Sequence, residues 1–121
     1  MKNITKSSFL ILPISFIFII SCTNMPTPTA QIVGAYTSEL KYKDYSCEDL
    51  AKEVNNLARR ESQLVIAQEQ RIKTSKTQAF WLSLFQEIGY GQGDGVEASE
   101  LAVVRGEKNA VRDAMSNKEC N

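Results

Sequence analysis

Histidine is absent from this sequence, and its 14 basic residues are balanced by 14 acidic ones. Without histidine, the chain lacks the side chain that most often serves as a general base and as a metal ligand. A net charge of zero provides no positive field to hold the phosphates of a nucleic acid. No nucleophile is recognisably placed beside a base. The sequence therefore predicts a protein that is not an enzyme and that binds no cofactor, metal or nucleic acid.

A phosphate-binding loop is also missing, although glycines occupy every second position from Gly89 to Gly95. The segment lacks the lysine of a phosphate loop and does not fit the dinucleotide-binding fingerprint. Asp94, Glu97 and Glu100 do not have the spacing of a calcium loop. The glycines are therefore expected to form a flexible turn, and the acids to stabilise the start of a following helix.

No apolar run is long enough for a helix that spans a membrane, which needs about 20 residues. The most apolar stretch, Phe9 to Ile20, has 12 residues and contains Pro13. It follows two lysines and precedes a small residue, Ser21, an order that is typical of a secretion signal. Residues 1–21 are therefore expected to be a signal that is removed on export.

The run Ile19-Ile20-Ser21-Cys22 resembles the lipobox of bacterial lipoproteins. This resemblance implies that Cys22 is acylated and becomes the first residue of the mature protein. Because Thr23 stands where an aspartate would imply retention at the inner membrane, it further implies the outer membrane, facing the periplasm. The alternative is that Cys22 is an ordinary thiol near a standard cleavage site, which an oxidising compartment disfavours.

Residues 22–45 are expected to be an acylated N-terminus and an extended tether. Pro26 and Pro28 lie in the polar stretch from Thr23 to Gln31 and disfavour a helix there. At about 3.1 Å per residue, this stretch would lift a folded part roughly 25 Å from the membrane. The residues that follow, up to Tyr45, show no pattern that assigns their structure.

Two cysteines, Cys47 and Cys120, are left for pairing once Cys22 carries lipid, and one pair allows one intramolecular bridge. An oxidising envelope would close it. A closed loop of this length stabilises a fold by roughly 4 kcal/mol in the chain-entropy model. The alternatives are two free buried thiols or a redox pair, and the absence of a Cys-x-x-Cys motif disfavours the latter. The sequence therefore favours a structural disulfide.

The segment from Cys47 to about Lys76 contains neither glycine nor proline and is expected to be one long helix. Ser46 precedes it in the manner of an N-cap. Glu61 and Gln68 interrupt its apolar stripe, which disfavours a long coiled coil. The apolar residues at helical spacing are Leu50, Val54, Leu57, Leu64 and Ile72.

A second helix is expected from about Val96 to Ser116, with alanines beside its apolar face that allow close approach to the first helix. Cys47 opens the first helix and Cys120 follows the second, so an antiparallel arrangement brings both sulfurs to one end. The predicted fold class is therefore mainly α. Residues 46–121 are expected to form an antiparallel helical hairpin, closed by the disulfide, with a short aromatic connector helix.

The segment from Phe80 to Ile88 is the expected connector helix, because it is rich in large apolar residues and lies where the chain must fold back. These side chains either cap the core of the hairpin, as a small bundle requires, or form a partly exposed patch that docks a protein or a membrane surface. The candidate docking patch consists of Phe80, Trp81, Leu84 and Phe85.

Several short motifs stand together in the second part of the chain: Tyr45-Ser46-Cys47, Phe80-Trp81 with Phe85, Gly93-Asp94-Gly95, Glu100-Leu101-Ala102, Gly106-Glu107 and Cys120. As a set they resemble those of a group of small, uncharacterised proteobacterial lipoproteins. The resemblance implies a lipoprotein with a helical hairpin, and it carries no catalytic residue. Members usually have proline after the tryptophan and a longer apolar run; Leu82, Gln86 and Glu87 depart from this, which disfavours membrane insertion of the connector.

These observations together predict a non-enzymatic lipoprotein of the cell envelope that acts as a structural or protein-interaction module. It would be held to the membrane through its lipid and would dock on another envelope protein. The alternative is a peripheral lipoprotein that perturbs or senses membranes through its aromatic connector.

Overall fold

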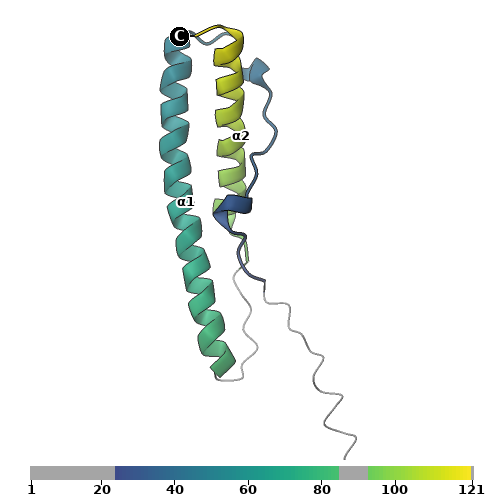
Figure 1. Cartoon of the computed structure of the whole chain (residues 1–121), viewed down its shortest axis with the longest axis vertical. Coiled ribbons are helices and arrows are strands. Elements are labelled where there is room, and N and C mark those ends of the chain that lie inside the picture. The colour runs from purple at the N-terminus through teal and green to yellow at the C-terminus, as the bar shows by residue number, and fades with distance from the viewer. Residues whose placement is uncertain (1–23, 85–92, 121) are drawn as a thin grey trace, which may run out of the picture.

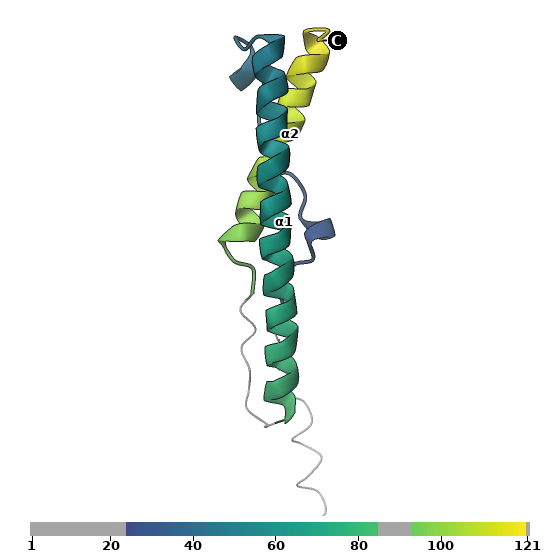
Figure 2. The ribbon, with the colours of Figure 1, turned by 90° about the vertical axis from the view of Figure 1, so that its left-hand side faces the viewer.

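The computed structural model describes residues 24–84 and 93–120, which form a helical hairpin. Helix α1 (Cys47–Leu84) and helix α2 (Val96–Asn117) lie side by side and antiparallel (Figure 1, Figure 2). No strand occurs among the described residues. The predicted mainly α class and the antiparallel hairpin are therefore confirmed.

Ser46 caps the start of α1, as the sequence predicts. Its hydroxyl accepts a hydrogen bond from the Asp49 backbone N–H at 3.1 Å and donates one to the Asp49 carboxylate at 2.6 Å. The Ser46 carbonyl accepts the bond from the Leu50 N–H at 2.9 Å. Because the first amides of a helix have no partner inside it, these bonds determine where α1 begins.

Helix α1 continues past its predicted end near Lys76 and ends at Leu84. No glycine or proline interrupts these residues, so nothing local stops the helical hydrogen bonding. Phe80 and Trp81 therefore belong to α1, and a separate connector helix is not shown. The rest of the expected connector, residues 85–88, lies outside the described residues.

Gly93 supplies the unusual backbone angle that the sequence predicts for the turn before α2. Its φ is +57°, in the left-handed region that favours glycine. Its N–H donates to the carbonyl of Asn24 at 3.0 Å, which connects this turn to the N-terminal part of the chain. Helix α2 then begins at Val96, where the sequence places it.

Two apolar clusters hold the helices together. Leu50 and Leu57 of α1 lie in the larger cluster, towards the disulfide end, and Leu64 packs against both clusters. Fully burying a leucine or valine contributes about 1.5–3 kcal/mol. The buried members of the larger cluster are Tyr42, Leu50, Leu57, Val104, Ala110, Val111 and Ala114. Those of the smaller cluster are Ile32, Ala98 and Leu101.

A disulfide joins Cys47 to Cys120, as predicted. Their Cα atoms are 5.6 Å apart, although 73 positions separate the two residues in the chain. The bridge connects the first residue of α1 to the turn that follows α2. It closes this end of the hairpin and limits the conformations that the unfolded chain can adopt, a contribution of roughly 4 kcal/mol in the chain-entropy model.

The opposite end of the hairpin is open, because α1 is much longer than α2. At 1.5 Å per residue, the 38 residues of α1 span about 57 Å and the 22 residues of α2 about 33 Å. Since the disulfide aligns the helices at one end, α1 extends beyond the start of α2 at the other (Figure 1). We call residues 76–84 of α1 the tip.

Residues 24–45 lie along the hairpin, and we call them the strap. The sequence predicts an extended tether here, and the strap does contain only two short 3-10 helices, η2 (Thr29–Gln31) and η3 (Glu39–Tyr42). It does not stand away from the helices, however, because Ile32 and Tyr42 are buried against them. Between these two anchors the strap crosses α2 from one side to the other (Figure 2).

Candidate docking site and the strap

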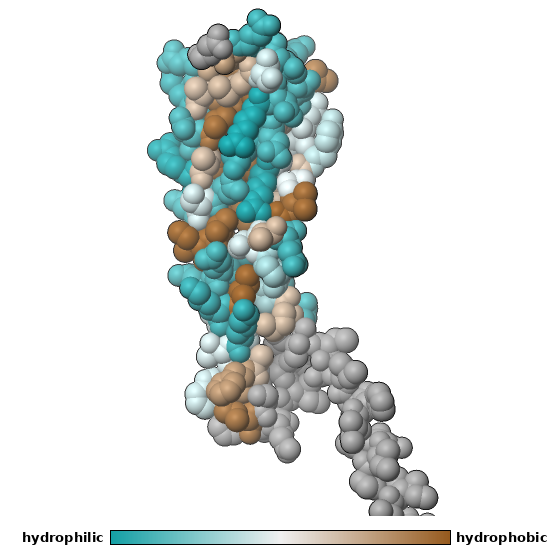
Figure 3. All heavy atoms as spheres, in the orientation of Figure 1, coloured by the Kyte–Doolittle hydropathy of each residue, from teal (hydrophilic) through white to brown (hydrophobic). Residues whose placement is uncertain are grey.

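Three of the residues expected in the docking patch lie together at the tip. The side chains of Phe80, Trp81 and Leu84 are 60%, 54% and 57% exposed. The two aromatic rings meet edge to face, with centroids 5.8 Å apart. The space-filling view shows apolar side chains gathered at this end of α1 (Figure 3). The fourth expected residue, Phe85, lies outside the described residues.

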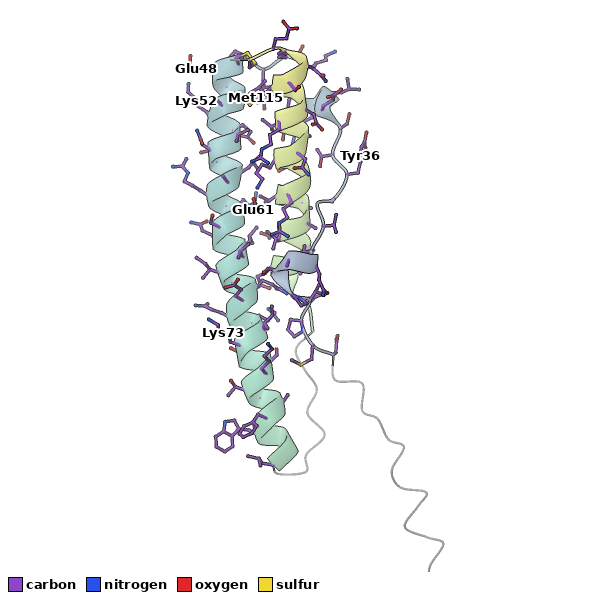
Figure 4. The ribbon with its side chains drawn as sticks, viewed as in Figure 1. Tyr36, Glu48, Lys52, Glu61, Lys73 and Met115 are labelled. Carbon is purple, nitrogen blue, oxygen red and sulfur yellow. A yellow bond between two sulfur atoms is a disulfide. The ribbon has the colours of Figure 1, made fainter. Side chains whose placement is uncertain are left out.

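Basic residues precede this apolar end of α1. Lys73 and Lys76 are exposed, and Lys73 projects from the side of α1 that faces away from α2 (Figure 4). No acidic residue occurs in the sequence between Glu69 and Glu87. The end of α1 therefore combines apolar rings with positive charge.

A polar cluster between the helices attaches the strap. Glu61 of α1 lies between α1 and α2 (Figure 4). The Nε of Arg105 is 2.9 Å from the Glu61 carboxylate, and the Lys108 ammonium also binds this carboxylate. The Arg105 guanidinium further donates to the strap carbonyls of Thr29, at 2.7 Å, and Ile32. One arginine therefore joins α1, α2 and the strap.

Gln68 provides a second attachment of the strap. This side chain is fully buried, and its amide donates to the Thr27 carbonyl at 3.1 Å and to the Asp94 carboxylate at 3.2 Å. Asp94 in turn accepts hydrogen bonds from the backbone N–H and the hydroxyl of Thr27. The strap is thereby bound both to α1 and to the turn before α2.

The backbone of the strap passes close to α2 at Gly106. A Cβ atom at this position would lie 1.7 Å from the carbonyl oxygen of Ala35, closer than any non-bonded atoms can approach. The Ala35 N–H donates to the helix carbonyl of Ala102 at 2.8 Å. Only a glycine in α2 leaves room for the strap to make this bond.

The carboxylates of the two attachments are held in their charged form. Burial alone would raise the pKa of Glu61, but the hydrogen bonds and charges of Lys108 and Arg105 outweigh burial and lower it below the ordinary value of 4.5. The hydroxyl and N–H of Thr27 lower the pKa of Asp94 below 3.8. Both groups therefore remain ionised at neutral pH, which preserves the attachments of the strap.

The attachments were not anticipated from the sequence, although one signal pointed to them. Glu61 and Gln68 interrupt the apolar stripe of α1, and the sequence alone suggests only that a long coiled coil is disfavoured. In the structure Glu61 binds Arg105, which holds the strap, and Gln68 binds the Thr27 carbonyl of the strap directly. Polar residues at inward positions of a helix indicate buried polar partners, but the partners here are distant in sequence.

Two further properties concern the described parts of the chain. Among residues 24–84 and 93–120, no three His, Cys, Asp or Glu side chains are grouped so that they could hold a metal ion. Neither helix in these ranges has an apolar stretch of the length needed to cross a membrane. The expected acylation site, Cys22, lies outside them, as does the expected signal over residues 1–21.

No protein-family model, curated protein or solved structure shows significant similarity to this chain.

Proposed function

We propose that this chain is a non-enzymatic lipoprotein of the cell envelope, held in the outer membrane by an acylated Cys22 and facing the periplasm. Its disulfide-closed hairpin acts as a structural or interaction module, and the tip is the docking site. The case against an enzyme is the absence of histidine and of a recognisable nucleophile and base.

The observation that carries this proposal is the exposure of large apolar side chains at the tip. Phe80, Trp81 and Leu84 are each more than half exposed within the last two turns of α1. Fully burying a large apolar side chain stabilises a fold by about 1.5–3 kcal/mol. Because these three side chains are exposed, the hairpin does not gain much of this stabilisation from them. A contiguous apolar surface of this kind is typical of an interaction site.

The anchor is tested by the fate of Cys22. We expect the mature protein to begin at this residue and to carry fatty acyl chains, which mass spectrometry of the N-terminal peptide detects. A Cys22→Ser variant should carry no acyl chains. An unmodified Cys22 in the isolated protein would rule out the anchor.

The docking role is tested by crosslinking in intact cells. A photoreactive amino acid at Leu84 should give adducts, whereas the same amino acid at Asn55, an exposed position of the same helix, should give few. Protein and lipid adducts are both scored, so the experiment assumes no class of partner. Equal adduct yields at the two positions would show that the tip is no docking site.

The alternative function, a lipoprotein that senses or perturbs membranes, is favoured by a specific observation. Lys73 precedes the tip, Lys76 is its first residue, and no acidic residue occurs between Glu69 and Glu87. Another envelope protein is the occupant that the sequence suggests.

A further inference from the structure

The last turns of α1 carry positive charge that nothing in the described structure neutralises. Arg71 pairs with Glu97 of α2, with 3.0 Å between the charged groups. Lys73 and Lys76, by contrast, make no ion pair with any described residue and are exposed. These two lysines are therefore available to an anionic partner.

The spacing along the helix suits a membrane surface. At 1.5 Å per residue, Lys76 lies about 7.5 Å from Trp81 along the helix axis and Lys73 about 12 Å. Apolar side chains of surface-bound helices are buried about 5–10 Å into the boundary between headgroups and acyl chains. With Trp81 at that depth, the flexible lysine side chains reach the level of the phosphates.

Tryptophan itself favours this environment. This residue type combines a large apolar ring with a polar indole N–H, so it prefers the interface between lipid and water. Phe80 and Leu84 lie within one turn of Trp81 and are equally exposed. The tip thus presents three apolar side chains, and Lys76 and Lys73 lie one to three turns before them on α1.

The anchor limits which end of the hairpin can meet the membrane. The hydrogen bond between Gln68 and Thr27 attaches the strap to α1. From Thr27 to Cys22 a fully extended chain covers about 17 Å. From Gln68 the helix continues about 24 Å to Leu84 in one direction and about 32 Å to Cys47 in the other.

The acylated residue can therefore never reach the disulfide end while the strap is attached. The tip, in contrast, extends at least as far as the anchor when α1 stands upright on the membrane. Asn24, the first described residue, also lies on this side, beside Gly93 in the turn before α2. An anchor at Cys22 consequently brings the tip to the lipid surface.

We propose that the tip is a membrane-surface site, with Phe80, Trp81 and Leu84 at the headgroup boundary and Lys73 and Lys76 on the phosphates of anionic lipids. This site rests on the proposed function, because the acylated Cys22 holds it against the leaflet that carries the anchor. Neither helix crosses the bilayer in this arrangement. The hairpin stands on its open end, and the disulfide end points away from the membrane.

Trp81 is the only tryptophan of the chain, so its fluorescence reports the tip directly. The acylated protein is reconstituted into vesicles of phosphatidylcholine and phosphatidylglycerol whose acyl chains carry bromine near the carbonyl group. We expect the emission to shift to shorter wavelength and the bromine to quench it. An emission unchanged from that in detergent-free buffer, without quenching, would overturn the membrane site.

A second experiment separates the tip from the anchor. The mature chain with Cys22→Ser, its fold verified by circular dichroism, should bind phosphatidylglycerol-containing vesicles more tightly than phosphatidylcholine vesicles, and less tightly as salt is added. The double variant K73Q/K76Q should bind about 30-fold more weakly, because each lysine near an anionic surface contributes about a fivefold factor. The matched variant K43Q/R112Q, with the same change in charge at the disulfide end, should bind unchanged.

The outcomes distinguish the two proposals. If Cys22 is not acylated in cells but the Cys22→Ser protein binds vesicles through the tip, the anchor is wrong and the membrane site stands. If Cys22 is acylated but both double variants bind equally, the site is wrong and the anchor stands. Crosslinks from Leu84 to one envelope protein, with Trp81 unquenched in vesicles, would assign the tip to a protein partner instead.

Discussion

The two ends of α1 belong to one continuous helix but differ in what covers them. Near the disulfide, α2 and the strap pack against α1, and Leu50 and Leu57 are 0% and 4% exposed. At the tip, Phe80 and Trp81 are 60% and 54% exposed on the same helix. Apolar residues therefore stabilise the fold at one end and stay accessible at the other.

The difference in exposure between the two ends follows from the lengths of the two helices rather than from their composition. Both ends of α1 carry large apolar residues, and the sequence alone leaves open whether those at the tip are buried or exposed. Helix α2 has 22 residues and α1 has 38, so α2 does not extend as far as the tip. The length of the shorter helix thus decides where the core ends and where apolar side chains become exposed.

Removal of the disulfide, which closes one end of the hairpin, should give the largest change in the free energy of unfolding. Replacing Cys47 and Cys120 together by serine removes the constraint on the unfolded chain and should lower the free energy of unfolding by about 4 kcal/mol. Urea unfolding followed by circular dichroism measures this change. Adding reductant to the unsubstituted protein should reproduce it, and an unchanged midpoint in both cases would show that the bridge does not stabilise the fold.

A leucine-to-alanine substitution near each end of α1 compares the two ends directly. Leu57→Ala should lower the free energy of unfolding by about 3 kcal/mol, since it leaves a cavity in the larger cluster. Leu84→Ala removes the same atoms from a side chain that is 57% exposed and should change stability by less than about 0.5 kcal/mol. Urea unfolding of the pair gives the contrast. Similar losses for both leucines would mean that the tip is part of the core.

The substitution Gly106→Ala should displace the strap from α2. The added Cβ would overlap the Ala35 carbonyl, so the strap must move away from α2, at a cost of about 2 kcal/mol after the gain in helix propensity. Hydrogen exchange should accelerate in residues 29–42 and remain unchanged at the tip. Asn109→Ala, at an exposed site of the same helix, is the matched control and should leave the exchange of the strap unaltered.

The helices and the disulfide were predictable because their signals are local or few. The start of α1 shows its cap at Ser46, the body lacks glycine and proline, and two cysteines leave one pairing once Cys22 is assigned elsewhere. The end of α1 was not predictable to the same degree. No residue near Lys76 stops the helix, so the sequence alone does not indicate the residue at which α1 ends.

The strap was beyond sequence reasoning for a physical reason. Arg105 binds it through the backbone carbonyls of Thr29 and Ile32, and a carbonyl carries no information about residue type. Gly106 has its role because Ala35 crosses there, and no periodicity links these two positions. These contacts are made by backbone atoms of residues that are distant in sequence. Such contacts leave no recognisable pattern in the amino-acid sequence.

Acidification should produce the smallest of these effects, through the ion pairs that Glu61 makes with Arg105 and Lys108. Because the pKa of Glu61 is lowered in the folded state, its contribution to stability is complete above the ordinary carboxyl value near 4.5 and is lost as the pH falls through the lower folded value. Urea unfolding at pH 7 and pH 3 should therefore show a smaller loss for Glu61→Gln than for the unsubstituted protein, because the amide cannot titrate. Glu69→Gln, at an exposed site of the same helix, should lose as much stability as the unsubstituted protein. If Glu61→Gln and Glu69→Gln show the same loss, the ion pairs of Glu61 with Arg105 and Lys108 do not hold the strap.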